Sequence, residues 1–555
     1  MSTRVLRLAV LALVASAAIA ASGQSFRVQC PTSTITHPNA ANNNSEPNYT
    51  APTTWSTPTP TSYLTPTGNV NGAIKCQQIS GGDGYSTMAN GVQTYMFSFG
   101  PLSGLTKMAE GLPGTDFPYE FNVPYPSNLR PGDPATTDGA NSGAPYADYS
   151  NTNPNGATPA FNWNGAVGIA PDLDAQANGT CGGTGQPSCI DGHVDPRQIM
   201  DIGVMNGNIP APLMAIDEDD EFFLTLTNVG MIMRPDLFEQ HTVHFHGYPN
   251  ASPFYDGVPD ASVAINIGGS FTYYYLAPDA GTYFWHCHIT PPEHLQMGMV
   301  GQIYVRPRQD RVPAGNSLHA SLVAQQSDLR TACKTTVDIL CTNPVPPTDN
   351  GAVAAATIVD GGTGGYAYND GDGSTHYDVE YPLQIHGFDP DFHFVGMTFN
   401  PEAFVDMKDK FFLLNGRSYP DTVTPGPLTT MSTDGSSHFS QPLPSIINIP
   451  AGGKALLRIS DLDVTEYQTL ASLGIPMHVI GYNAKLLRDQ SGNNMDYYTN
   501  SITLAGGESL DVILDASNTT LYPKNSVFYL YTPNLDHLSN DQENFGGLMT
   551  EVRIN

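Results

Sequence analysis

A dense cluster of histidine, cysteine and methionine side chains constrains this chain more than any other feature of its sequence. Eight side chains that can bind a metal ion lie within 59 positions, and six of the fifteen histidines of the chain are among them. The eight residues are His241, His244, His246, His286, Cys287, His288, His294 and Met299. Scattered histidines are usually surface or hydrogen-bonded core residues, so this concentration predicts metal binding.

The spacing of these residues predicts which side chains share a face. Side chains alternate between the two faces of a strand, so His244 and His246 point the same way, as do His286 and His288. Cys287 must then point away from its two neighbours. One strand can therefore serve two metal sites back to back, with the cysteine as the electron conduit between them.

The ligand types favour copper over zinc. A thiolate and imidazoles with a weak thioether ligand select copper, whereas zinc prefers a tetrahedral set without a distant methionine. The segment 286–299 supplies such ligands in a loop that leaves an expected strand. The alternative, a buried cysteine among unrelated histidines, does not account for this set of ligand types.

Composition and patterning favour an all-β chain. Only 13% of the 555 residues are charged, while Gly (54) and Pro (46) are abundant, which suits short strands joined by turns. Strand-like runs form one group at 92–99, 215–228, 242–245, 270–276, 281–285 and 300–305, and a second at 411–414, 445–449, 455–459, 477–480, 501–504, 510–514, 527–531 and 548–554. Two β-sandwich domains are therefore expected.

The segments outside these groups have distinct characters. Arg4 and Arg7 precede an apolar run that ends in small residues, which predicts an export signal over 1–24 and a periplasmic or extracellular protein. A Thr-, Pro- and Asn-rich stretch has too few apolar residues to order itself. The expected divisions are a leader over 25–85, a copper-binding domain over 86–307 with an insertion at about 105–198, a loop-rich connection over 308–379 and a second domain over 380–555.

The charge balance excludes two classes of partner. Acidic residues outnumber basic ones 52 to 22, giving a formal charge of -30. Such a chain repels nucleic acids and anionic lipid surfaces. No apolar run after the export signal is longer than it, so no membrane span is expected.

Seven cysteines leave one thiol without a partner if the rest form disulfides. Cys287 is the best candidate for the free thiol. An oxidising compartment would allow neighbours in the sequence to pair, although the sequence leaves the connectivity open. The expected pairs are Cys181 with Cys189, Cys333 with Cys341, and Cys30 with Cys76.

Residues 206–305 resemble a copper-bearing cupredoxin domain of the multicopper oxidases. The resemblance is carried by Asn-Gly-Asn-Ile-Pro-Ala-Pro at 206–212, His-Thr-Val-His-Phe-His-Gly at 241–247, Asp-Gly-Val-Pro at 256–259, Gly-Ser-Phe-Thr-Tyr at 269–273 and Gly-Thr-Tyr-Phe-Trp-His-Cys-His at 281–288. It implies a type 1 copper, which takes electrons from a small organic or metal-ion donor, and type 2 and type 3 coppers, which reduce dioxygen to water. The implied type 1 ligands are His241, Cys287, His294 and axial Met299, and the implied type 2 and type 3 ligands are His244, His246, His286 and His288.

By the same resemblance, Cys287, His286 and His288 are the expected catalytic residues. The second half is similar to a degenerate cupredoxin domain of the family, with matching segments at 411–420 and 447–453. Its segment 476–481 carries one histidine, His478, where a copper-binding domain would have a pair.

Two departures from the family leave alternatives open. The loop from the cysteine to the histidine is lengthened by residues 290–293, and the chain has two histidine pairs where a complete trinuclear site draws on four. Either a second subunit of a homo-oligomer completes the cluster, or fewer coppers bind. His386 and His393, in a Gly-, Asp- and Pro-rich context, are interpreted as solvated loop residues rather than as a substrate-metal site, and Met297 as a packing residue.

Two other functions compete with the oxidase. An enzyme similar to copper nitrite reductases would bind a type 2 copper at His246 and His286, with His478 or His537 from a neighbouring subunit. The extra imidazoles of His244 and His288 favour the oxidase. A blue-copper electron carrier or copper-storage protein would need the type 1 ligands alone.

Overall fold

The computed structural model describes residues 73–121, 207–326, 364–397 and 403–555, together with Cys30, Pro31, Thr34, residues 345–347 and Gly351. Within these ranges it leaves out 105–106, 109, 232, 235–236, 238, 248–251, 268, 278, 313–314, 432–436 and 542. The expected export signal, most of the insertion at 105–198, and Cys181, Cys189, Cys333 and Cys341 lie outside the described residues.

The first domain is a sandwich of two four-stranded sheets. One sheet has the order β2 (Gln93–Pro101), β1 (Ile74–Thr87), β4 (Glu221–Gly230) and β6 (Ser270–Leu276). The other has the order β3 (Met214–Asp217), β8 (Val300–Arg306), β7 (Gly281–His286) and β5 (His244–Phe245). One core cluster draws side chains from both sheets.

Alternation along β6 shows how the sequence builds this core. Phe271, Tyr273 and Tyr275 point into the cluster and are nearly inaccessible, while Tyr274 between them is half-buried on the other face. Aromatic and β-branched side chains suit such a pleated surface. Burial of a side chain such as Phe271 contributes about 1.5–3 kcal/mol.

Strand β1 corrects one expected boundary. It pairs with β2 on one side and β4 on the other, and both Ile74 and Ile79 are fully buried. The core of the first domain therefore begins at Ala73, inside the segment 25–85 that the sequence suggested was a leader. The sequence concealed this strand because β1 is rich in glycine and small polar residues, and only its pairing on both sides buries it.

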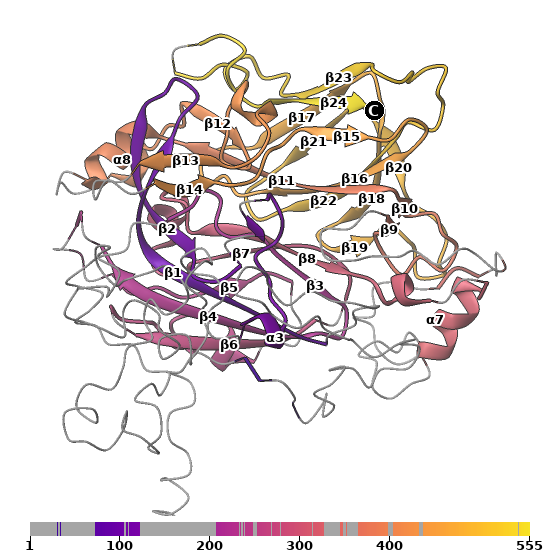
Figure 1. Cartoon of the computed structure of the whole chain (residues 1–555), viewed down its shortest axis with the longest axis horizontal. Coiled ribbons are helices and arrows are strands. Elements are labelled where there is room, and N and C mark those ends of the chain that lie inside the picture. The colour runs from indigo at the N-terminus through magenta and orange to yellow at the C-terminus, as the bar shows by residue number, and fades with distance from the viewer. Residues whose placement is uncertain are drawn as a thin grey trace, which may run out of the picture.

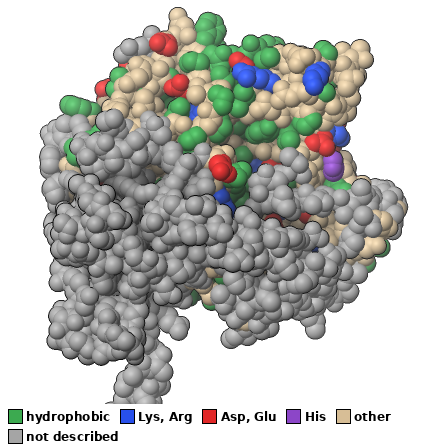
Figure 2. Space-filling view, viewed as in Figure 1, with side chains coloured by type: hydrophobic (Ala, Val, Ile, Leu, Met, Phe, Trp, Pro, Cys, Tyr) green, Lys and Arg blue, Asp and Glu red, His purple; other side chains and the backbone are tan. Residues whose placement is uncertain are grey.

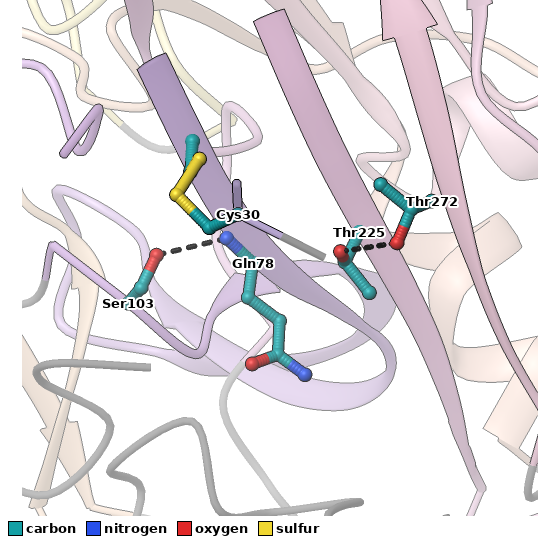
Figure 3. Close-up of a disulfide and its surroundings, with 6 residues drawn as sticks. Cys30, Gln78, Ser103, Thr225 and Thr272 are labelled. Carbon is teal, nitrogen blue, oxygen red and sulfur yellow. Dashed lines mark hydrogen bonds between the residues drawn. A yellow bond between two sulfur atoms is a disulfide. The ribbon is translucent and has the colours of Figure 1, made fainter. Parts of the chain in front are cut away.

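A disulfide ties Cys30 to Cys76 on β1, as expected (Figure 3). The neighbouring contacts are polar: the backbone N–H of Gln78 donates to Ser103 Oγ at 2.8 Å, and the hydroxyls of Thr225 and Thr272 lie 2.8 Å apart. The covalent link fixes residue 30 to a strand at the centre of its sheet.

The second domain is a larger sandwich. Its seven-stranded sheet comprises β12 (Phe411–Leu414), β11 (Val379–Phe388), β16 (Lys454–Asp461), β22 (Ser509–Asp515), β18 (Met477–Tyr482), β19 (Lys485–Leu486) and β20 (Tyr497–Thr499). Its five-stranded sheet comprises β15 (Ile447–Ile449), β24 (Met549–Ile554), β23 (Val527–Tyr531), β17 (Gln468–Leu473) and β21 (Ser501–Leu504). A separate aliphatic cluster fills the space between the sheets.

Short elements complete the described chain. Two small hairpins pair β9 (Gly365–Tyr366) with β10 (His376–Tyr377) and β13 (Leu428–Met431) with β14 (Ser437–Gln441). The helices are α3 (Pro118–Phe121), α6 (Pro291–Gln296), α7 (Leu318–Gln326), α8 (Pro390–Met397) and the 3-10 turns η4 (Pro253–Tyr255), η5 (Arg308–Arg311), η6 (Phe404–Asp406) and η7 (Asp421–Val423). None of the described helices combines the length and the apolar character needed to cross a membrane.

The two sandwiches pack directly against each other. In Figure 1 the second, coloured orange to yellow, lies over the first, and β7 and β8 face β11, β16 and β22. Thr282 on β7 donates to Asp511 at 2.5 Å, and Gln302 on β8 donates to Ser460 at 2.7 Å. The strand that ends at His286 is thus fixed to both domains.

A buried ion network crosses the same interface. Glu380 on β11 accepts from Arg306 of the first domain at 2.7 Å and from Arg458 of the second at 3.0 Å. Burial alone raises the pKa of Glu380, but the two guanidinium groups outweigh it and lower the pKa to about 2. Buried charges of this kind stabilise the fold only while they remain paired, because an unpaired buried charge is strongly destabilising.

The expected all-β class and the two sandwich domains are confirmed. The face of the second sandwich shown in Figure 2 mixes hydrophobic side chains with scattered charges, and over its described part no patch of a single sign covers it.

Candidate metal centre

Three side chains from separate elements form the first cluster, called here the cysteine cluster. His241 lies before β5 and bridges to Ile265, Cys287 follows β7 directly, and His294 lies on α6. Their ligand atoms all lie within 4.8 Å of one another, and all three side chains are buried. The distance between His294 Nδ1 and Cys287 Sγ is 3.3 Å.

The backbone around α6 ties a fourth residue, Met299, to two residues of this cluster. The extra residues 290–293 form the start of α6, whose first turn contains two prolines and follows Thr290 at a φ of 37°. After the helix, Met299 N–H donates to His294 O at 2.8 Å, and Cys287 N–H donates to Met299 O at 3.0 Å. Buried Met299 is therefore tied to both ligand positions through the backbone.

The electrostatics of the cysteine cluster favour a thiolate. Burial alone raises the pKa of Cys287, but the His294 ring and the backbone N–H groups of Thr242 and Ile289 outweigh it, so the pKa is lowered. Burial alone lowers the pKa of His294, but Cys287 and Glu239 raise it to about 10. The thiolate is the form that binds a metal ion.

His241 provides a direct test of whether a metal ion fits. Its ring is fully buried, yet neither Nδ1 nor Nε2 has a hydrogen-bond partner. Burial, followed by the charge of His294, also lowers its pKa well below the usual value, so the ring is neutral. A buried neutral imidazole without a partner fits a metal ligand, and the thiolate and imidazole set fits copper.

The second group, called here the histidine cluster, lies on the other side of Cys287. His244, His246 and His286 bring their ligand atoms within 4.8 Å of one another, and the Nε2 atoms of His246 and His286 are 3.0 Å apart. β5 pairs with β7 so that His244 lies opposite His286. The ring of half-buried His288 is 5.0 Å from that of His244.

Hydrogen bonds to the backbone orient the rings of the histidine cluster. His286 Nδ1 lies 2.6 Å from Cys287 O, and His244 Nδ1 lies 2.6 Å from Asp256 O. A proton on each Nδ1 leaves Nε2 free to bind a metal ion. Burial is the largest cause that lowers the pKa of His286 to about 3 and that of His246 to about 4, and neighbouring histidines lower both further.

A cavity of about 490 Å³ opens beside the histidine cluster. Its first-domain wall includes His246, His286 and the two prolines of α6, and its second-domain wall consists of residues 462–467 and 505–507. Asp463 and Glu466 belong to the second wall. A small molecule in this cavity would meet imidazoles on one side and carboxyl groups on the other.

Two other histidines that the sequence suggested as ligands have partners elsewhere. His478 Nε2 lies 2.9 Å from Asp496, and its ring stacks on Tyr498. His537 contacts Glu466 at 2.8 Å and Gln468 at 2.9 Å. Among the described residues, neither belongs to a group that could hold a metal ion.

The interpretation of His386 and His393 as solvated loop residues was wrong. His386 lies on β11 and His393 on α8, and their exposed fractions are 2% and 0%. The polar context of the sequence was misleading because both residues are covered by the first domain, which a local pattern does not reveal. Met297 is fully buried in the first core, as its interpretation as a packing residue required.

Sequence reasoning also missed Glu239, Asp463 and Glu466. Glu239 Oε2 lies 3.5 Å from His294 Nε2, and its position two residues before His241 was the one local signal for it. Asp463 and Glu466 reach the cavity only through domain packing.

Two β-sandwiches with a buried cysteine–histidine cluster, backed by a histidine cluster on the same strand, define the class of cupredoxin-type copper proteins. The sequence model of the multicopper oxidase family matches residues 191–310, the segment that contains both clusters, so this part of the chain is similar to a domain of that family.

Known relatives are similar over about a fifth of the chain. It is 34% identical over 109 residues to laccase abr2 of Aspergillus fumigatus and 36% identical over 117 residues to laccase-1 of Emericella nidulans. These matches cover 19% and 21% of this chain and 17% of each relative. The chain thus matches about a sixth of the length of these laccases.

Two solved structures are also similar. A blue copper oxidase from Nitrosomonas europaea has 20% identity and a TM-score of 0.41, over 63% of this chain and 78% of that one. A copper nitrite reductase from the same organism has 14% identity and a TM-score of 0.36, over 63% of this chain and 84% of that one.

Proposed function

We propose that this protein is a copper-dependent oxidase that takes electrons from a small organic or metal-ion donor and reduces dioxygen to water. One observation carries the proposal: His286, the last residue of β7, and Cys287, which directly follows it, belong to two different clusters. Type 1 copper would be held by His241, Cys287, His294 and Met299. The type 2 and type 3 coppers would be held by His244, His246, His286 and His288.

Bound copper supplies the one-electron chemistry, and the chain supplies the connection between the two sites. The covalent path from Cys287 Sγ to either neighbouring imidazole runs through a single peptide bond. The contact of His286 Nδ1 with Cys287 O at 2.6 Å adds a second, shorter route. Cys287, His286 and His288 are therefore the proposed catalytic residues.

The cavity supports the dioxygen half of the proposal. Reduction of dioxygen to water consumes protons, and Asp463 and Glu466 line the space beside His246 and His286. Glu466 is about half exposed, with 49% of its side chain accessible, and so can exchange protons with solvent. The cavity is large enough to admit dioxygen.

The number of histidines bears on assembly. Among the described residues, the second domain contributes carboxyl groups rather than a histidine pair to the cavity wall. A full trinuclear cluster therefore needs ligands from a second copy of the chain in a homo-oligomer. His478 and His537 are weaker candidates as ligands in such an assembly, because each has a carboxylate partner within 2.9 Å.

A nitrite reductase-like activity is the second candidate. The observation that favours it is that three mutually close ligand atoms, from His244, His246 and His286, suffice for a single type 2 ion. A non-enzymatic blue-copper carrier would use the cysteine cluster alone. An export signal at 1–24 and a periplasmic or extracellular location belong to all three proposals.

Copper quantitation with optical and paramagnetic resonance spectra separates these functions. The oxidase is expected to bind more than two coppers per chain, to show an intense blue band and to consume dioxygen with a reductant. Two coppers per chain with turnover of nitrite would favour the reductase-like enzyme, and one copper would favour the carrier. A colourless protein with a reactive Cys287 thiol after copper loading would overturn the proposal.

A further inference from the structure

The last turn of α6 is attached to the second domain as well as to its own. His386 Nε2 on β11 lies 3.0 Å from Leu295 O, and His393 Nε2 on α8 lies 3.0 Å from Gln296 O. These two carbonyls directly follow His294. The last carbonyls of a helix have no partner within its regular hydrogen bonds. Leu295 O accepts from the backbone N–H of Gly298 at 2.9 Å, and His386 adds a second contact from the other domain.

The side chain of Gln296 is held by the same domain. Its Nε2 donates to Asp409 Oδ1 at 2.9 Å, and its Oε1 accepts from the backbone N–H of Asp389 at 3.1 Å. Gln296 is fully buried, so these contacts replace the hydrogen bonds that its amide would otherwise make to water. Both hydrogen-bonding ends of the amide are therefore occupied by the second domain.

Whether each histidine donates to an α6 carbonyl depends on which ring nitrogen carries its proton. Burial lowers the pKa of His386, and a neutral ring that carries its proton on Nε2 donates to Leu295 O. Burial lowers the pKa of His393 to about 3. Its Nδ1 lies 2.6 Å from Tyr95 O on β2, so a single proton on this ring serves one of two carbonyls.

Apolar packing continues the attachment. Leu295 packs in a cluster with Phe284 and Val300 of the first domain and Leu462 of the second. The segment from Cys287 to Met299, called here the ligand loop, is thus enclosed between the sandwiches. Its position depends on a domain that contributes no side chain to the cysteine cluster.

We propose that the second sandwich is a brace for the ligand loop, in which His386 and Gln296 are positioning residues that keep His294 against Cys287. This role explains why a domain whose described residues add no ligand to the cysteine cluster packs so closely on it. This inference rests on the proposed function only for the identity of the metal, because the hydrogen bonds that form the brace lie within the protein itself.

The first test uses the full-length protein without copper. Cys287 is inaccessible, so iodoacetamide alkylates it only when the ligand loop opens, and peptide mass spectrometry separates it from the other cysteines. The substitution His386→Phe keeps an aromatic ring but removes the hydrogen-bond donor. We expect alkylation of Cys287 to become about tenfold faster, because one buried hydrogen bond is lost.

Two further variants make the test specific. His386→Gln retains an amide donor near the place of Nε2 and should return the rate to within about threefold of the unmutated protein. His376→Phe, a half-buried histidine on β10 whose ring lies beside Tyr366, is the matched control and should leave the rate unchanged. Gln296→Leu removes both amide contacts and should accelerate alkylation at least as much as His386→Phe. If His386→Phe does not fold, the alkylation rate of Gln296→Leu tests the brace in its place.

The second test uses the copper-loaded protein. With His386→Phe we expect a weaker blue band and a shifted reduction potential, and with His386→Gln the values of the unmutated protein. The brace is overturned if folded His386→Phe and Gln296→Leu both alkylate at the original rate, or if His386→Gln is as fast as His386→Phe. A colourless unmutated protein would instead refute the type 1 copper, while the alkylation rates would still decide the brace.

Discussion

Gly81 on β1 lies so close to the ring of His241 that a Cβ atom at position 81 would be 2.6 Å from Cδ2 of the imidazole. The contact joins a strand of one sheet to a ligand of the cysteine cluster, on the side where His241 is fully buried. The absence of a side chain at position 81 therefore sets how far the imidazole can extend toward β1.

Gly81→Ala should displace His241. Because the ring is enclosed, the added methyl group forces a shift of the ring or of β1, and overpacking of this kind costs about 1–3 kcal/mol. We expect weaker copper binding and a loss of blue absorbance, measured by copper titration. Ser86→Ala on the same strand is the control, because the hydroxyl it removes has no hydrogen-bond partner. Equal affinity in Gly81→Ala and the unmutated protein would contradict the close contact.

Cys287→Ser should abolish any intense blue colour and all turnover. Serine is similar in size but does not form a thiolate, so the fold is retained while the sulfur ligand is lost. Optical spectra and copper content after loading test this outcome. Blue colour that survives the substitution would mean that the colour arises at another site.

His288→Ala should preserve the blue colour but stop the consumption of dioxygen. Its ring lies on the side of the histidine cluster, 5.0 Å from that of His244, and takes no part in the cysteine cluster. An oxygen electrode with a reducing donor, combined with the optical spectrum, separates the two effects. Undiminished oxygen uptake would show that the assignment of the histidine cluster is incorrect.

Acid should weaken the domain interface through Glu380. Its pKa in the folded protein is lowered from 4.5 to about 2, so its contribution is present above pH 4.5 and is lost as the pH falls toward 2. A pKa shift of this size corresponds to about 3 kcal/mol in the free energy of unfolding. Denaturant unfolding between pH 2 and 7 measures it.

Glu380→Gln should remove this part of the acid dependence. The variant should also be less stable at neutral pH, because Arg306 and Arg458 lose their charged partner. Glu551→Gln, which changes a pair with partly exposed Arg553, is the control and should behave like the unmutated protein. The same acid dependence in Glu380→Gln would refute the role of this carboxylate.

Loss of the disulfide between Cys30 and Cys76 should destabilise the first domain. The link closes a loop of 46 residues, for which chain entropy gives about 4 kcal/mol. Cys30→Ser should lower the free energy of unfolding by an amount of this order, measured with and without a reducing agent. If reduction of the unmutated protein leaves its stability unchanged, the disulfide is not formed in solution.

Regular alternation allowed much of the fold to be predicted. β6 and β12 have the bounds that the sequence indicated, and each run of the second group corresponds to a strand of the second sandwich. Other strands, such as β17, were not indicated, and β11 and β1 were missed for different reasons. β11 reads as a mixed polar and apolar segment, and β1 is buried by its partners on both sides rather than by its own hydrophobicity.

The sequence alone determined which atoms can bind a metal ion, and that Cys287 faces away from His286 and His288, because side-chain alternation along a strand is local. Only the tertiary structure decided that His241 meets Cys287, that Gly81 makes room for it, and that His386 is buried against Leu295. These relationships join residues far apart in the chain, and they depend on how the sheets and domains pack, which no local pattern encodes.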